Sequence, residues 1–513
     1  MSKAKPLMFL GTGSDVGKSV LAAAFCRILR QEGYRVAPFK AQNMALNSYI
    51  TPEGGEMGRA QVVQAEAAGI DPHVDMNPVL LKPTSHMGSQ VIVLGRAIGN
   101  LSARDYYEYK KELVSVVRDS FDRLSSRYDI IVMEGAGSAV ELNLKPHDLV
   151  NMAMAEMADA RCILVGDIDR GGIFAALLGS YSLLEPSERA RVAGFIVNKL
   201  RGDPALFTEG TSIIESRSGR PVLGVVPWFD HIALPEEDSV ALGRRMGKNG
   251  GSHEKDTVLI GVVRLPFISN YTDFDCFEHD PRVKLVYFDK PARAFDFDAV
   301  VLPGSKNTIE DLAALGRTGM SDAIRAYYKS GGTVVGLCGG YQMMGKVVRD
   351  PLGMESALTE IPGLGLLDME TEMYPEKVTS QVEAVLSGDP GLFQDCAGPL
   401  HGYEIHMGRS TSLGGAGTLF RIQCRDGKPV DIADGLIQSC GRAWGTYIHG
   451  IFDNDEFRNS FVRGIAQRSG KEPPPTDGPL NYRQWKDRQY DLLAEYVRRH
   501  VDVHRILEAV LCK

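Results

Sequence analysis

The chain has 513 residues, with 57 Lys and Arg against 65 Asp and Glu, which gives a formal net charge of −8. This length exceeds what one hydrophobic core usually holds, so we expect two or three domains, and 44% apolar with 24% charged residues is an ordinary globular composition. The negative charge argues against a general nucleic-acid-binding surface, and no apolar run approaches the ~18 residues of a membrane span.

The eight cysteines are scattered, with no CxxC pair and no metal-ligand spacing. This usage predicts a reduced, cytoplasmic protein in which most cysteines are small buried apolar residues. The start of the chain is basic and then briefly apolar, but it leads directly into a glycine-rich loop. We therefore interpret it as a first β-strand rather than a signal peptide.

Short apolar runs alternate with helical stretches over residues 1–235. The runs are PLMFLG, RVAPFK, YDIIVMEG, ARCILVGD, RVAGFIVNK and RPVLGVVP. Continuous apolar strands separated by helices indicate a parallel sheet that is buried on both faces. Ligands bind at the carboxyl ends of the strands in such sheets, so the residues that end these runs are the first candidates for chemistry.

A glycine-rich loop, FLGTGSDVGKS at residues 9–19, separates the first predicted strand from a helical run. Glycines such as Gly13 and Gly17 let the backbone N–H groups and the helix N-terminus face a phosphate. Lys18 would reach the terminal phosphates of ATP, and Ser19 would supply a hydroxyl to Mg²⁺. The spacing is one residue longer than the strict GxxxxGK(S/T) pattern. A turn that binds no ligand is the weaker alternative.

Charged residues end other strands of this half. Glu134 ends YDIIVMEG, so its carboxylate would lie near the phosphate loop and complete the coordination of Mg²⁺ with Ser19. Lys40 ends RVAPFK and would neutralise charge on the transferring phosphoryl group, with a surface lysine as the alternative. Asp167 and Asp169 follow a third strand, where metal binding, orientation of an acceptor and capping of a helix N-terminus are all open.

The composition becomes polar and glycine-rich over residues 236–256, which indicates a linker. A second α/β series follows over residues 257–455, with the runs TVLIGVVRLP, VKLVYF, FDAVVLPG and GTVVGLCGG and the later strands TLFRIQC and RAWGTYIHG. Residues 456–513 form a largely helical extension. The fold class is therefore α/β, with two main domains.

The segment GTVVGLCGGYQ at residues 332–342 predicts a strand, then Gly-x-Cys-x-Gly, then a helix. This is the cysteine version of a nucleophile elbow, in which flanking glycines permit a strained turn. The turn would expose the thiol of Cys338 at a helix N-terminus, which favours the nucleophilic thiolate. A buried structural cysteine is the alternative. His449 ends a later predicted strand and is the candidate base.

Several motifs resemble a known family. KAQNMALNS at residues 40–48 is similar to the signature of the cobyric acid synthase family, and GTGSDVGKS resembles the nine-residue loop of dethiobiotin synthetase and its relatives. The similarity includes EGAGS at 134–138, ELNL at 141–144 and VGDIDRGG at 165–172, and it covers nearly the whole chain. It implies a P-loop parallel-sheet synthetase domain followed by a flavodoxin-like glutamine amidotransferase domain of the triad type (class I).

The same resemblance implies roles for further residues. Asn198 would read the adenine edge of ATP, and Gln42 and Asn43 would contact the acceptor. Backbone N–H groups near Ser305 and at Gly339 would form an oxyanion hole. The acceptor that the family implies is adenosylcobyrinic acid a,c-diamide, which is amidated on its b, d, e and g carboxylates in cobalamin biosynthesis.

One position departs from the usual amidotransferase pattern. The glutamate expected two residues after the histidine is replaced by Ile451, so another group must orient His449 or none does. Glu404 and His406 in HGYEIHMGR are candidates, and they could equally face the acceptor or hold a domain interface. The same departure is expected among the cobyric and cobyrinic acid amidases.

Together, the two halves imply one reaction. Phosphoryl transfer from Mg·ATP would turn a carboxylate into an acyl phosphate. Cys338 would attack the side-chain amide of glutamine, release ammonia and form a thioester that water hydrolyses. Ammonia would then attack the acyl phosphate along a sheltered path, because it would be protonated in solvent. We therefore expect a glutamine-hydrolysing, amide-forming ligase with ATP, Mg²⁺, glutamine and a corrinoid carboxylate as its ligands.

Three alternatives are weaker. KAQNMALNS argues against the sister enzyme, cobyrinic acid a,c-diamide synthase, and CTP synthase carries the glutamate that is absent here. A ParA-like ATPase switch with a degenerate amidotransferase domain is disfavoured by the intact Cys338 and His449. The phosphate loop also lacks the extra lysine near its start that marks the ParA-like switch ATPases. The sequence sets neither the order of amidations nor the oligomeric state, and a homo-oligomer is compatible with it.

Overall fold

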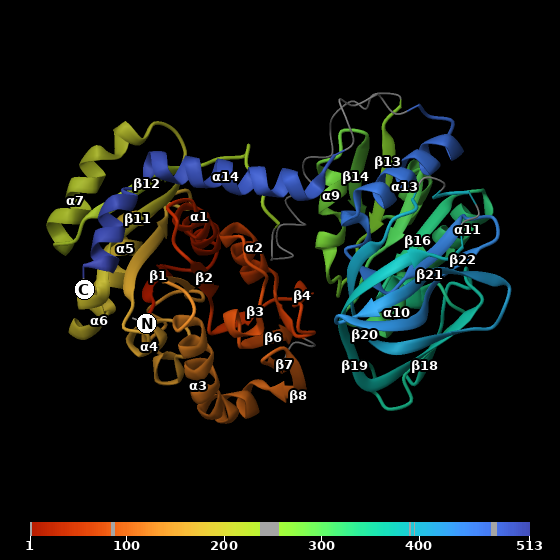
Figure 1. The fold of residues 1–513 in the computed structure, drawn as a ribbon, viewed down its shortest axis with the longest axis horizontal. Helices are drawn as coiled ribbons and strands as arrows, with labels where there is room; N and C mark the ends of the chain where they lie inside the picture. Colours follow the sequence, from red (N-terminus) through yellow and green to blue (C-terminus); the bar gives the residue numbers. More distant parts are fainter. Residues whose placement is uncertain are drawn as a thin grey trace. The chain divides into compact units, whose positions relative to one another are not determined.

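The computed structural model describes residues 3–83, 88–235, 256–388, 391–393, 396–472 and 480–512. The chain forms two compact units (Figure 1). Unit 1 comprises Met1–Ala45, Glu56–Pro235 and Lys486–Lys513, and unit 2 comprises Leu46–Gly55 and Glu236–Trp485. Each unit thus includes a segment that is distant in sequence from the rest of the unit: Lys486–Lys513 in unit 1 and Leu46–Gly55 in unit 2. The predicted linker at 236–256 lies outside the described residues, except for Asp256.

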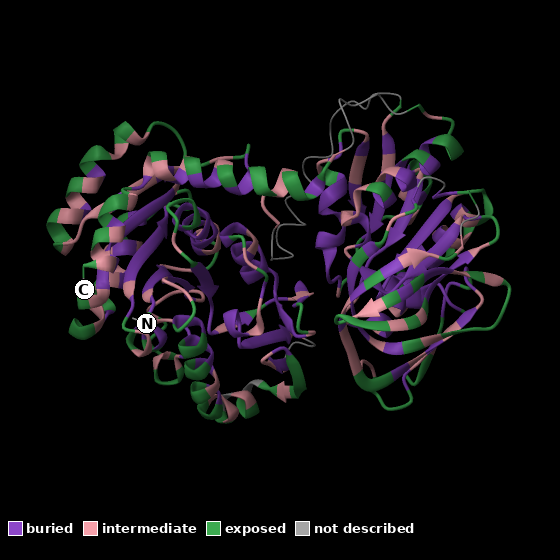
Figure 2. Ribbon diagram, in the orientation of Figure 1, coloured by how far each residue is buried: buried purple, intermediate pink, exposed green. Residues whose placement is uncertain are grey.

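A parallel sheet of described strands forms the centre of unit 1, in the order β12-β11-β10-β1-β9-β2. Its strands are β1 (Lys5–Gly11), β2 (Val36–Phe39), β9 (Ile130–Glu134), β10 (Arg161–Asp167), β11 (Val192–Leu200) and β12 (Val222–Pro227). The central strands β1, β9 and β10 are almost entirely buried, and Figure 2 shows the strands around β1 mostly as buried. The predicted parallel sheet is confirmed, and its parallel register brings the carboxyl ends of these strands to one edge.

Helices accompany this sheet, as the alternating pattern predicts. They are α1 (Lys18–Gln31), α2 (Arg59–Ala68), α3 (Ala103–Ser125), α4 (Met152–Met157), α5 (Ile173–Leu183), α6 (Pro186–Arg191) and α7 (Thr208–Ser218). Unit 1 also holds a smaller mixed sheet, in the order β3-β6-β7-β8, which the apolar runs do not predict. Its strands are β3 (Gln42–Met44), β6 (Val79–Pro83), β7 (Gly88–Val93) and β8 (Arg96–Ser102). The short strand β5 (Glu56–Gly58), which is not part of this sheet, precedes α2.

Unit 2 is built on a sheet that is parallel in one part and antiparallel in the other. The parallel part has the order β14-β13-β15-β16-β23, with β13 (Val258–Val263), β14 (Val283–Phe288), β15 (Ala299–Leu302), β16 (Thr333–Leu337) and β23 (Ala443–Thr446). The sheet continues through β22 (Lys428–Gln438), β21 (Ala416–Arg425), β19 (Met369–Leu386), β17 (Val347–Arg349) and β18 (Glu360–Pro362). β20 (Leu400–Ser412) pairs with β19 and with β24 (Ile448–His449).

The described helices of unit 2 range from the four residues of α9 to the 14 residues of α13. They are α9 (Asp275–Glu278), α10 (Thr308–Thr318), α11 (Met320–Lys329), α12 (Gly339–Met343) and α13 (Asp455–Arg468). Trp444 on β23 is fully buried and contacts the rings of Phe393, Phe457 and Phe461 at centroid distances of 5.5–5.9 Å. This aromatic cluster anchors α13 to the sheet, because large buried rings contribute most of the apolar area in a core.

The C-terminal part of the chain belongs to unit 1. Helix α14 (Tyr482–His500), from Lys486 onward, and helix α15 (Val503–Leu511) pack into the core that contains β1 and α1. Arg27 of α1 donates to Asp491 at 2.7 Å, and Tyr490 donates to Glu66 at 2.6 Å. The last helices are therefore a structural part of the P-loop unit. Within the described residues, no helix is long and apolar enough to cross a membrane.

Leu493→Ala tests this assignment. Leu493 is fully buried in the core of unit 1, so its truncation should destabilise the unit by about 2–5 kcal/mol. Hydrogen-exchange mass spectrometry should show faster exchange in peptides from β1 and β10. The control is Leu206→Ala, because Leu206 is 86% exposed. Unchanged protection in Leu493→Ala would contradict the assignment.

Candidate active sites

The phosphate loop joins β1 to α1 through a backbone conformation that requires glycine. Gly17 has φ 99° and immediately precedes Lys18, the first residue of α1. A Cβ at Gly17 would lie 2.1 Å from Asn198 Nδ2, and this same amide donates to the carbonyl of Val16 at 2.8 Å. Asn198 thus lies against the loop. Its predicted contact with adenine stays a prediction.

Lys18 lies over the loop, almost entirely buried. Its ammonium donates to the carbonyls of Gly13 at 2.8 Å and Gly137 at 3.0 Å. Burial lowers the pKa of Lys18 to about 8, against the opposing effect of Glu134. A bound polyphosphate would raise the pKa of Lys18 again, because a nearby anion favours the protonated form.

Glu134, at the end of β9, is the centre of a buried polar cluster. Its Oε1 accepts hydrogen bonds from Ser19 Oγ and Lys40 Nζ, each at 2.8 Å, and its Oε2 accepts one from Gln64 Nε2 at 2.6 Å. Burial opposes ionisation, but Lys40 and the hydrogen bonds outweigh it and lower the pKa of Glu134. The structure therefore brings Ser19, Lys40 and Glu134 together, whereas Gln64 has no signal in the sequence beyond its place in a helix.

The Ser19 hydroxyl and the Glu134 carboxylate are hydrogen-bonded at a spacing that two ligands of one Mg²⁺ ion could also have, and binding of Mg²⁺ there stays a prediction. Two ligands on neighbouring corners of an octahedron, each about 2.1 Å from the metal, are about 3 Å apart. The 2.8 Å between Ser19 Oγ and Glu134 Oε1 fits that edge. Among the described residues, no group of three or more His, Cys, Asp or Glu side chains is arranged to hold a metal.

Asp167 and Asp169 are engaged by basic side chains. Lys199 Nζ donates to Asp167 at 3.0 Å, and Arg201 Nε donates to Asp169 at 2.5 Å. Helix α5 begins after Gly172, so the capping role considered for the two aspartates is wrong for this helix. These ion pairs join the chain at the end of β10 to the chain at the end of β11, and a metal- or acceptor-binding role for either aspartate stays a prediction.

The two predicted acceptor contacts lie on β3. Gln42 accepts a hydrogen bond from the Tyr106 hydroxyl at 2.6 Å, and Asn43 donates to Gln61 Oε1 at 3.0 Å. Asn43 is almost completely buried, whereas Gln42 is partly exposed. Contact of either residue with an acceptor stays a prediction.

Cys338 occupies a strained turn between β16 and α12. Its backbone has φ 49° and ψ −109°, a conformation that L-residues rarely adopt. A Cβ at Gly340, two residues after Cys338, would lie 2.1 Å from the carbonyl oxygen of Leu302, so a larger residue cannot fit. Backbone strain of this kind concentrates at functional sites. The turn has the form of the nucleophile elbow described above.

His449 is oriented by a carboxylate that the sequence patterns do not identify. Its Nδ1 lies 2.7 Å from Asp273 Oδ2, and the Gly450 N–H donates to Asp273 Oδ1 at 2.9 Å. Burial disfavours the charged ring, but Asp273 and Cys338 outweigh it and raise the pKa of His449 to about 10. Nε2 makes no hydrogen bond of ordinary geometry among the described residues, and because Asp273 lies at Nδ1, Nε2 is the ring nitrogen left for the interaction with the Cys338 thiol that helps to raise the pKa.

Glu404 and His406 do not take this orienting role. Glu404 accepts from Arg425 at 2.5 Å and lies 3.6 Å from His406 Nε2. The His406 ring stacks on Tyr447 at a centroid distance of 3.8 Å. The orienting carboxylate is therefore Asp273, which lies 176 residues before His449 in the chain. No local spacing could have revealed that pairing.

The predicted oxyanion elements adjoin each other. A Cβ at Gly339 would lie 2.9 Å from the backbone nitrogen of Ser305. The Ser305 hydroxyl donates to Asp311 at 2.5 Å and accepts from the Asn307 N–H at 3.0 Å, which fixes the loop. Burial raises the pKa of Asp311 to about 7. An oxyanion hole at Ser305 and Gly339 stays a prediction that this proximity supports.

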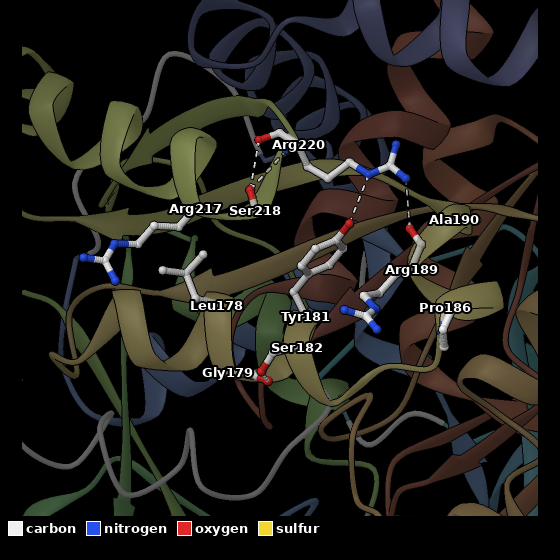
Figure 3. Close-up of a pocket in the computed structure, with 10 residues that line it drawn as sticks. All are labelled: Leu178, Gly179, Tyr181, Ser182, Pro186, Arg189, Ala190, Arg217, Ser218 and Arg220. Atoms are coloured by element: carbon white, nitrogen blue, oxygen red, sulfur yellow. Dashed lines mark hydrogen bonds between the residues drawn. The ribbon is translucent and has the colours of Figure 1, made fainter.

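A pocket of about 800 Å³ in unit 1 lies apart from these groups. Arg220 crosses it and donates to the Tyr181 hydroxyl and to the Arg189 carbonyl, each at 3.2 Å (Figure 3). None of the predicted site residues lines this pocket, and we assign it no role.

Asp273→Asn should lower kcat for glutamine hydrolysis by about 10²–10⁴-fold, because the imidazolium loses its counter-charge and its tautomer is no longer fixed. The loss of the carboxylate should also lower the pKa of His449. Glu404→Gln is the matched control, a buried carboxylate of the same unit. A wild-type rate in Asp273→Asn, measured as glutamate release, would exclude the orienting role.

Comparisons with known proteins agree with this geometry. Residues 7–241 match a family model described as a CobQ/CobB/MinD/ParA nucleotide binding domain. Residues 259–457 match a CobB/CobQ-like glutamine amidotransferase domain. One solved structure, described as a glutamine amidotransferase, covers 40% of this chain and 98% of its own at 20% identity, but its TM-score of 0.30 is too low to support an argument.

Full-length relatives carry the more specific information. A cobyric acid synthase of Syntrophobacter fumaroxidans is 71% identical over 99% of this chain and 98% of its own length. A cobyric acid synthase of Salmonella arizonae is 50% identical over 98% of this chain and 97% of its own. The chain therefore belongs to the cobyric acid synthase family of glutamine-dependent, amide-forming ligases.

Proposed function

We propose that the chain catalyses ATP- and glutamine-dependent amidation of the b, d, e and g carboxylates of adenosylcobyrinic acid a,c-diamide. The observation that carries this proposal is the presence, in one chain of this family, of a phosphate-loop cluster around Glu134 and a Cys338–His449–Asp273 arrangement. Residues 1–235 would form the synthetase part and residues 257–455 the amidotransferase part.

In the synthetase part, the phosphate-loop N–H groups and Lys18 would bind the phosphates of ATP. Ser19 and Glu134 would hold Mg²⁺, which when bound neutralises charge on the phosphate oxygens. An acceptor carboxylate oxygen would attack the γ-phosphorus and displace ADP, with Lys40 next to the developing charge. Ammonia would then attack the carbonyl carbon of the acyl phosphate, and inorganic phosphate would leave.

In the amidotransferase part, Cys338 Sγ would attack the carboxamide carbon of glutamine. His449 would pass a proton to the departing ammonia, and then, as a base, take one from the water that hydrolyses the thioester to glutamate. The backbone at Ser305 and Gly339 would stabilise the oxyanion of each tetrahedral intermediate. All eight cysteines are free thiols, which supports a reducing compartment, and we propose the cytoplasm.

Wild type and Cys338→Ala separate the two parts. With ATP, Mg²⁺ and the a,c-diamide, mass spectrometry should show stepwise amidation by the wild type from either glutamine or ammonia. The glutamine-dependent rate of Cys338→Ala should be at least about 10³-fold lower than that of the wild type, whereas its ammonia-dependent rate should equal that of the wild type. If wild type hydrolyses ATP and glutamine without changing the acceptor, the corrinoid assignment is wrong.

Glu134→Gln keeps the size of the side chain but removes the charge that would hold Mg²⁺. Ammonia-dependent amidation should fall by about 10²-fold or more, and calorimetry should show weaker Mg²⁺-dependent binding of ATP. Glu56→Gln is the matched control, because Glu56 is also buried and paired with a lysine, Lys82, at 2.8 Å. Equal nucleotide binding by wild type and Glu134→Gln would exclude the metal role.

A further inference from the structure

The segment Leu46–Gly55 belongs to unit 2, although the residues on both sides of it belong to unit 1. It follows β3, which carries Gln42 and Asn43, by only a few residues. The segment contains the short strand β4 (Ser48–Ile50), and Ile50 is fully buried in a small cluster with Tyr403 and Ile405. The amidotransferase unit is therefore completed by a piece of chain from the first half.

Two side chains converge on one carbonyl of this segment. The carbonyl of Ser48 accepts hydrogen bonds from Asn270 Nδ2 at 3.2 Å and from the Tyr403 hydroxyl at 3.4 Å. Asn270 Nδ2 also donates to the Tyr403 oxygen at 3.0 Å. All three residues are at most 4% exposed. Buried polar groups are costly unless paired, so the position of the carbonyl constrains both side chains.

The same two residues adjoin His449 and Asp273, Tyr403 through its ring and Asn270 through its backbone. The Tyr403 ring stacks on His449 with a centroid distance of 5.3 Å and an interplanar angle of 18°, and the two residues are register partners between β20 and β24. Asn270, with φ 52° and ψ 34°, precedes the 3₁₀ turn η5 (Tyr271–Phe274), and its carbonyl accepts from the Asp273 N–H at 3.1 Å. The Tyr403 ring thus packs on the base, and the backbone of Asn270, whose side chain is held by Ser48 and Tyr403, begins the turn that carries the orienting carboxylate.

We propose that Tyr403 and Asn270 are positioning residues that couple glutamine hydrolysis to acceptor binding, with the Ser48 carbonyl as their anchor. This rests on the proposed function, because the acceptor would bind at Gln42 and Asn43, directly upstream of the anchor. If acceptor binding favours one position of the segment, the Ser48 carbonyl would favour one position of Tyr403. The Tyr403 ring would in turn favour the matching position of the His449 ring that stacks on it. Such coupling requires only a different affinity of the acceptor for the two arrangements.

The segment's other attachments are consistent with an anchored element. Gln381 on β19 donates a hydrogen bond to the Ile50 carbonyl, and the Tyr49 ring meets Tyr403 at 4.9 Å. A Cβ at Gly54, which has φ 82°, would lie 3.3 Å from the carboxylate of Asp426. The segment is thus fixed at several points after Ser48. We therefore expect a displacement of the chain before Ser48 to change the position of the Ser48 carbonyl and of the two side chains that bind it.

Tyr403→Phe removes only the hydroxyl and keeps the stacked ring. Glutamate release is measured with ATP and Mg²⁺, with and without the a,c-diamide. We expect the acceptor to stimulate kcat in wild type and this stimulation to fall by about tenfold or more in the variant, with KM for glutamine changed less than about twofold. Asn270→Gly, which keeps the left-handed backbone without the amide, should have the same effect.

Tyr327→Phe is the matched control, because the Tyr327 hydroxyl also donates to a buried carbonyl of unit 2, that of Phe297, at 2.9 Å. It should keep wild-type stimulation. Ammonia-dependent amidation, measured in parallel, should be the same in all variants. Stimulation of Tyr403→Phe equal to wild type would overturn the coupling alone. A wild type that cannot amidate the a,c-diamide even with ammonia would overturn the proposed function and the coupling with it.

Discussion

The ion pair between Asp273 and His449 sets what the amidotransferase unit can do. A fully buried imidazole without a counter-charge would stay neutral, because burial disfavours its charged form. Asp273 lies 2.7 Å from Nδ1 and, together with Cys338, reverses that preference, so the pKa of the ring is raised to about 10. The Tyr403 ring stacks on His449, and the turn that begins after Asn270 carries Asp273, so both partners of the ion pair are held by neighbouring residues.

In the phosphate-loop unit, a buried anion is stabilised by a cation, whereas in the amidotransferase unit a buried cation is stabilised by an anion. Here the buried carboxylate of Glu134 is kept ionised by Lys40 and by two neutral donors. The pKa of Lys18, in contrast, is lowered by burial to about 8, while its ammonium donates to loop carbonyls. A buried ammonium with a lowered pKa is strongly stabilised by a nearby anion, and a bound polyphosphate would supply that negative charge.

Sequence reasoning identified what local patterns encode. The glycine spacing around Lys18, the glycines around Cys338 and the strand-end positions of Glu134 and His449 are consequences of short-range backbone geometry, and the structure places each of them where the patterns indicate. The parallel sheet of unit 1 follows in the same way from continuous apolar runs.

Features that depend on contacts between distant parts of the chain could not be predicted. Asp273 comes from a short 3₁₀ turn with no motif around it, and Gln64 is one polar residue in an otherwise ordinary helix. The exchange of Leu46–Gly55 and of the C-terminal helices between units leaves no trace in composition or periodicity. Glu404 and His406 looked suitable because they are charged and close in sequence to one another, but they pair with Arg425 and Tyr447 instead.

The most direct test is an NMR titration of the protein labelled with ¹⁵N-histidine, with the His449 signal assigned by its loss in His449→Gln. The account predicts that His449 stays protonated through neutral pH and titrates with a pKa of about 10, and that Asp273→Asn lowers this value. Titration near the ordinary histidine pKa of about 6.5, unchanged in Asp273→Asn, would contradict the central role of the Asp273–His449 pair.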